Sequence, residues 1–76
     1  MFHRQPRAGD ERRIIEFVEG QQAISETPTS LAHKLAADVR TVRRVLDHLV
    51  EAGEMHRRDM GKVEPIYYRY STLEDR

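Results

Sequence analysis

Residues 31–53, LAHKLAADVRTVRRVLDHLVEAG, decide how this chain folds. The second half of the stretch carries one apolar stripe at the helical spacing i, i+3, i+4, i+7 and i+8, formed by Val42, Val45, Leu46, Leu49 and Val50. Asp38 is a favourable N-cap before this stripe, and Gly53 is a favourable residue just past its end. We therefore predict a helix over residues 39–51 or 39–52.

A shorter helix is predicted immediately before it, over about Ser30 to Ala36, because Leu, Ala, Leu and Ala recur there at helical spacing. Two start signals are compatible with this helix. Thr27 caps it with Pro28 at the first helical position, or Thr29 caps it directly. Only a few residues separate the two helices, so the chain must reverse sharply, as in a helix-turn-helix.

The flanking segments complete the pattern. A first helix is predicted over residues 11–19, with Asp10 as its N-cap and an apolar cluster formed by Ile14, Ile15, Phe17 and Val18. Residues 21–26 form a connector or a short strand. Residues 55–58 and 66–70 are β-compatible and are separated by a glycine-centred turn at 59–62. The tyrosine side chains of the second strand are expected mainly to fill the core beside Met55, with at least one ring exposed.

The order helix, helix, short turn, helix and hairpin, together with the residues of 31–53, resembles winged helix-turn-helix DNA-binding domains of bacterial and archaeal transcription regulators. The resemblance covers about residues 11–70. It implies an α+β fold, a three-helix helix-turn-helix core with a C-terminal β-hairpin wing. That family commonly has glycine where Ala36 stands. Because alanine adopts a left-handed conformation only at a cost, we expect a tighter or more helical turn here.

A chain of 76 residues fits one domain with a small core and little room for a deep catalytic cleft. We predict a flexible basic arm at 1–9, the domain at 10–71 and a polar tail at 72–76. Cysteine is absent, and no stretch approaches the ~20 apolar residues that span a bilayer. The expectation is a soluble, cytoplasmic, nucleoid-associated protein of prokaryotic type.

Thirteen basic and thirteen acidic residues give a formal net charge of zero, so DNA binding would depend on where the charges lie. With the apolar stripe buried, residues 39–52 turn a set of polar side chains outward: Arg40, Thr41, Arg43, Arg44, Asp47 and His48. Arginine bonds guanine N7 and O6 in bidentate fashion, and threonine contacts a phosphate or a thymine methyl group. Asp47 and Glu51 follow Arg43 and Arg44 at helical spacing and are possible ion-pair partners.

The resemblance places the wing at about residues 57–62, against the DNA backbone or the minor groove. The predicted DNA-binding residues are Arg40, Thr41, Arg43, Arg44, His48, Arg57, Arg58 and Lys62. The expected function is that of a DNA-binding transcriptional regulator, acting as a homodimer because one small domain offers little interface. The arm, the first helix and the tail are the candidate dimer surfaces.

A second function stays open: a winged helix that serves as a protein-protein interaction module of a larger assembly, with weak or no DNA binding. The neutral charge and the tyrosine-rich strand favour it. An enzyme is not expected, because no P-loop or nucleophile elbow is present. No cofactor or metal is expected either, since His3, His33, His48 and His56 lack metal-ligand spacing.

Overall fold

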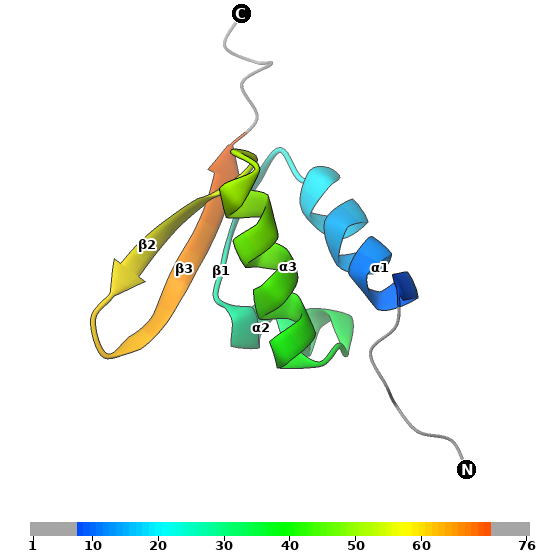
Figure 1. Cartoon of the computed structure of the whole chain (residues 1–76), viewed down its shortest axis with the longest axis horizontal. Coiled ribbons are helices and arrows are strands. Elements are labelled where there is room, and N and C mark those ends of the chain that lie inside the picture. The colour runs from blue at the N-terminus through cyan, green and yellow to red at the C-terminus, as the bar shows by residue number, and fades with distance from the viewer. Residues whose placement is uncertain (1–7, 71–76) are drawn as a thin grey trace, which may run out of the picture.

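The computed structural model describes residues 8–70 and has an α+β fold, with three helices and one three-stranded antiparallel sheet. The elements follow in the order α1 (Ala8–Glu19), β1 (Ala23–Glu26), α2 (Pro28–Leu35), α3 (Val39–Glu51), β2 (His56–Met60) and β3 (Val63–Tyr70). Figure 1 shows α3 at the centre, with α1 on one side and the β2–β3 hairpin extending on the other. The predicted order of helices and hairpin strands is confirmed. Within residues 8–70, no helix is long and apolar enough to cross a membrane.

The sheet has the strand order β1-β3-β2, so β3 is its central strand. β1 pairs with the end of β3, with Ser25 opposite Tyr68, and β2 pairs along its other side, with His56 opposite the same tyrosine. The segment at 21–26, which the sequence left as a connector or a strand, therefore contains a strand. Pro65 lies inside β3 and not at its entry. A missing N–H is tolerated at this position for two reasons. The pairing of β1 with β3 ends at Tyr67 and does not reach Pro65, and the pairing with β2 is irregular between Arg58 and Met60.

The first helix begins earlier than predicted. α1 starts at Ala8, so the last two residues of the predicted arm at 1–9 are helical. Asp10 is not the N-cap but a residue of the first turn, where its carboxylate accepts a hydrogen bond from Arg13 at 3.3 Å. Acidic residues in the first turn of a helix interact favourably with the helix dipole. Asp10 and Glu11 therefore stabilise the start of α1, where few apolar residues are present. The rest of the arm and the tail at 72–76 lie outside the described residues.

Thr27, and not Thr29, caps α2, which resolves the open choice of start signal. The Thr27 hydroxyl accepts a hydrogen bond from the Ser30 backbone N–H, and the Ser30 hydroxyl accepts one from Thr27. At the other end, Ala36 has φ 53° and ψ 46°, the left-handed conformation. The expectation of a tighter or more helical turn is wrong. The Ala37 N–H instead reaches the Ala32 carbonyl at 3.0 Å, as in a Schellman motif, and this bond requires a left-handed residue between them.

The core lies between the three helices and the inner face of the sheet. Its buried apolar residues are Ile14, Val18, Ile24, Leu31, Ala32, Val42, Val45, Leu46, Leu49, Met55 and Tyr67. Tyr67 is completely buried in this cluster together with Met55, while Tyr70 is 62% exposed. The expectation that tyrosine closes the core while at least one ring stays exposed is confirmed.

Candidate nucleic-acid interface

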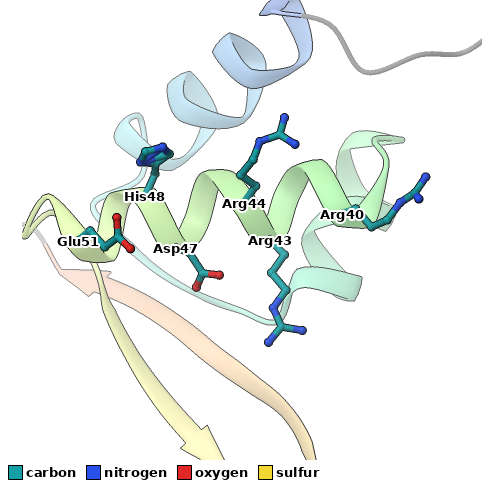
Figure 2. Close-up of a pocket in the computed structure, with 6 residues that line it drawn as sticks. All are labelled: Arg40, Arg43, Arg44, Asp47, His48 and Glu51. Carbon is teal, nitrogen blue, oxygen red and sulfur yellow. The ribbon is translucent and has the colours of Figure 1, made fainter.

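Helix α3 has the bounds that its sequence predicts because both of its ends are determined locally. The Asp38 carboxylate accepts a hydrogen bond from the Arg40 backbone N–H at 2.7 Å. At the other end Gly53 adopts φ 81°, which only glycine adopts without strain. The apolar stripe faces the core, so the opposite face is exposed to solvent. Figure 2 shows the side chains along it: Arg40, Arg43, Arg44, Asp47, His48 and Glu51.

Two of the three arginines on this face are engaged in ion pairs. Arg40, at the start of α3, pairs with the capping carboxylate of Asp38 at 3.2 Å, and this hydrogen bond lowers the pKa of Asp38. Arg44 points toward α1 (Figure 2) and pairs with Glu11 at 2.7 Å. Both arginine side chains stay more than half exposed. Water and salt screen exposed pairs of this kind, so neither pair holds its arginine strongly.

Arg43 points toward the hairpin (Figure 2) and makes no ion pair with any residue of 8–70. It lines a groove between α3 and the β2–β3 hairpin. The other residues that line this groove are Arg57, Asp59, Met60, Gly61, Val63 and Pro65. The structure thus brings together Arg43 and Arg57, which the sequence placed in two separate elements.

A hydrogen-bonded cluster fixes the hairpin to α3. The Asp47 carboxylate accepts a hydrogen bond from Arg57 at 2.9 Å and one from the hydroxyl of Tyr67 at 2.5 Å. Burial raises the pKa of Tyr67, and the bond to Asp47 raises it further. The prediction that Asp47 pairs with Arg43 or Arg44 is wrong. Asp47 turns toward the hairpin because two donors from β2 and β3 converge on one carboxylate oxygen.

Thr41 was predicted to contact DNA, and the structure contradicts this. Its side chain is only 1% exposed, and its Oγ1 has no hydrogen-bond partner among the described residues. The cause is the width of the buried stripe. Thr41 lies one helical turn before Val45, in the row that packs against the rest of the domain. The spacing to Val45 is the sequence signal that identifies Thr41 as a core residue.

The remaining predicted residues lie on different faces. His48 is exposed and lies beside Arg44 on the side of α3 that faces α1 (Figure 2). Lys62 is exposed in the hairpin turn next to Gly61, which has φ 79°. Arg58 does not line the groove beside α3. It lies with Tyr68 and Tyr70 instead, because successive residues of a strand point to opposite faces.

Sequence reasoning missed two features of the groove. The tip of the hairpin exposes apolar side chains, Met60 at 42% and Val63 at 67%, which face each other across the strands. Glu64 accepts a hydrogen bond from the Thr29 backbone N–H at 3.0 Å, and this contact lowers the pKa of Glu64. The positive charge of Arg43 also lowers that pKa, so Glu64 is close enough to Arg43 to interact with it. The sequence signal for the exposed tip is that Met60 and Val63 stand on either side of the Gly61-Lys62 turn.

The described residues hold no group of three or more His, Asp or Glu side chains that could bind a metal ion. No protein-family model, no curated protein and no solved structure matches this chain. Its function is therefore inferred from the residues and contacts described above.

Proposed function

We propose that this protein is a winged helix-turn-helix domain that binds double-stranded DNA as a transcriptional regulator. Helix α3 reads the major groove, and the tip of the hairpin, residues 59–62, contacts the DNA backbone. Helix-turn-helix proteins place the first turns of the second helix of the motif against base edges. In this chain those turns carry Arg40, Arg43 and Arg44 on a solvent-exposed face.

The observation that carries the proposal is the position of Arg43. Its guanidinium group has no ion-pair partner within residues 8–70 and faces a groove that Arg57 also lines. Of the three arginines, it is the one that binds a guanine edge without first releasing a carboxylate, and a bidentate contact of this type contributes about 1–3 kcal/mol of discrimination. Arg44 must first exchange Glu11 for DNA, so its contribution is smaller.

The decisive experiment is a backbone-amide NMR titration of the whole chain with duplex DNA at about 50 mM and about 200 mM salt. Shifts over residues 40–48 and 57–62 that weaken steeply with salt are expected. Arg43→Ala then lowers affinity for a selected site by about 1–3 kcal/mol. The matched control is Arg12→Ala, which removes the same charge from an exposed position on α1. On a single half-site, where the candidate dimer surfaces play no part, it should leave binding unchanged.

The hairpin contact is tested separately by Lys62→Ala. If Lys62 binds a phosphate, affinity falls equally for all sequences and the salt slope decreases by about one. A folded variant with alanine at Arg40, Arg43 and Arg44 that binds DNA as well as the parent chain would contradict the assignment of α3 as the helix that reads DNA. Absence of binding by the parent chain at low salt would contradict DNA binding itself.

We further propose that the regulator acts as a homodimer on a two-fold site. A single small module covers only roughly 600–1,000 Å² of DNA interface, which limits its affinity. Sedimentation in the presence of a two-fold site should show two chains per duplex. A single chain per duplex at saturation contradicts the dimer while leaving DNA binding by one domain intact.

A protein-protein interaction module is the alternative function. The ion pairs of Arg40 and Arg44 and the exposed apolar tip at Met60 and Val63 favour it. Salt-insensitive, saturable binding to a protein partner, with no binding to DNA at low salt, distinguishes this function from the first.

A further inference from the structure

The face of the sheet opposite the core carries a group of aromatic and polar side chains. We call it the outer sheet face, and its residues are Ser25, His56, Arg58, Ile66, Tyr68 and Tyr70. Tyr67 is buried in the core, so the residues that alternate with it along β3 point to the other side. The strand register brings Ser25 and His56 to either side of Tyr68. The face therefore draws on all three strands.

The rings on this face form a continuous row. The ring centroids of His56 and Tyr68 are 5.2 Å apart with an interplanar angle of 31°, and those of Tyr68 and Tyr70 are 5.8 Å apart. Beside the row lies a shallow hollow lined by Ser25, Arg58, Ile66, Tyr68 and Tyr70. This lining includes one cation and no carboxylate. The hollow therefore complements a negatively charged partner with flat apolar groups.

Sheet stability accounts for only part of the row. His56 and Tyr68 lie directly opposite each other on β2 and β3, and such cross-strand pairs stabilise a sheet. Tyr70 lies opposite Ala23, a small residue, and keeps 62% of its surface exposed. Its ring thus contributes little to packing within residues 8–70, and it extends the row away from the hairpin tip.

We propose that the outer sheet face binds an unpaired nucleic-acid strand, whose bases stack on Tyr68 and Tyr70 while Arg58 contacts the phosphates. Single-strand binding proteins combine aromatic platforms with nearby cations in this way, and stacking tolerates any base because every base has a flat face. This site does not depend on the α3 interface. Arg57 and Arg58 are neighbours in β2, but the first pairs with Asp47 of α3 and the second lies in the hollow.

The test measures binding of the whole chain to a labelled oligodeoxythymidylate of about 12 nucleotides by fluorescence anisotropy. The control ligand is an abasic strand of equal length and charge, which has the phosphates without the bases. We expect the thymidylate strand to bind at least tenfold more tightly. We expect Tyr70→Ala to weaken it by roughly fivefold to hundredfold while duplex binding is unchanged. Arg58→Ala should lower the salt slope by about 0.7.

Tyr70→Leu separates stacking from apolar contact, because it keeps an apolar side chain at an exposed position and removes the flat ring. Retained single-strand affinity in this variant, or equal affinity for the abasic strand, overturns the proposal. Absence of single-strand binding at low salt overturns it as well. Amide shifts at Ser25, Ile66 and Tyr68 that depend on protein concentration alone would show that this face joins two copies of the chain, which also excludes the proposed site.

Discussion

At the scale of single residues, Thr41 is buried with an unpaired hydroxyl group in the apolar face of α3. Burying a hydroxyl group without a hydrogen bond costs about 1–3 kcal/mol, and valine has the same shape without the polar atom. We expect Thr41→Val to raise the free energy of unfolding by about 1 kcal/mol. Thermal denaturation followed by circular dichroism should show a midpoint higher by about 4–8 °C.

The companion variant Thr41→Ala removes the methyl group as well as the hydroxyl group, so it should be less stable than Thr41→Val. DNA affinity should be the same in both, because the side chain does not reach the surface. If the Thr41→Val protein is stable but no longer binds DNA, Thr41 takes part in DNA binding after all.

Ala36 is the second residue at which a single substitution is informative. A left-handed conformation destabilises the folded state by about 1–2 kcal/mol when the residue is not glycine. Glycine removes this strain but also makes the unfolded chain more flexible, which lowers stability by about 0.5–1 kcal/mol. Ala36→Gly is therefore expected to stabilise the protein by about 0.5–1 kcal/mol in urea denaturation. The neighbouring Ala37 does not have a positive φ, so Ala37→Gly should destabilise it. Equal effects at both positions would contradict a strained turn.

At this scale the sequence predicts well the residues whose environment is set by their own helix. The outward direction of Arg40, Arg43 and Arg44 followed from the apolar stripe alone. Ion-pair partners did not follow, because they depend on segments far along the chain. Asp47 was expected to pair within α3, and its donors come from β2 and β3.

At the scale of the elements, local signals determine how much can be predicted. α3 matches its predicted bounds because a capping side chain and a terminal glycine mark its ends. The sequence does not decide whether β1 is a strand, because only Ile24 of its four residues is buried and β1 depends on pairing with β3, more than forty residues later. The sequence therefore does not predict the three-stranded sheet. The split of Arg57 and Arg58 between two faces follows from the alternation of the strand predicted over 55–58, but which of the two arginines faces α3 does not.

Tyr67 of β3 donates a hydrogen bond to Asp47 of α3, and we expect this bond to help hold the hairpin against the helix. Tyr67→Phe keeps the buried ring and removes only the hydroxyl group. Hydrogen bonds to charged groups contribute about 1.5–3 kcal/mol, and we expect a loss of this size in urea denaturation, with amide shift changes along residues 56–67.

Tyr70→Phe is the matched control for this variant, since the Tyr70 ring is largely exposed and its hydroxyl group makes no hydrogen bond within residues 8–70. It should leave stability unchanged. Similar losses in the two variants would show that the Tyr67 hydroxyl group does not hold the hairpin against α3.

At the scale of the whole molecule, opposite charges are used to join elements. Glu11 and Arg44 link α1 to α3, and Asp47 and Arg57 link α3 to β2. Glu26 at the end of β1 accepts hydrogen bonds from Lys34 and Ser30 of α2, both at 2.5 Å. Each of these ion pairs uses one acidic and one basic group, so together they leave the net charge unchanged. The positive charge offered by the groove between α3 and the hairpin therefore depends on Arg43, which makes no ion pair within residues 8–70.

These occupied carboxylates make the fold sensitive to acid. Burial alone raises the pKa of Glu26, but its hydrogen bonds with Lys34 and Ser30 outweigh burial and hold the pKa below 4.5. Glu26 therefore binds fewer protons in the folded state than in the unfolded state. Its contribution to stability is complete above the unfolded pKa of 4.5 and is lost as the pH falls through the lower folded value.

We therefore expect the free energy of unfolding, measured in urea at a series of pH values, to decrease as the pH falls below about 4.5. Glu26→Gln should be less stable than the parent chain at neutral pH and should show a shallower decrease on acidification. Glu19→Gln is the matched control, because Glu19 is exposed on α1 and makes no ion pair within residues 8–70. If both variants keep the full acid dependence of the parent, protonation of Glu26 does not cause the loss of stability in acid. Asp38, which binds Arg40, and Glu64, which binds Thr29, are then the next carboxylates to replace.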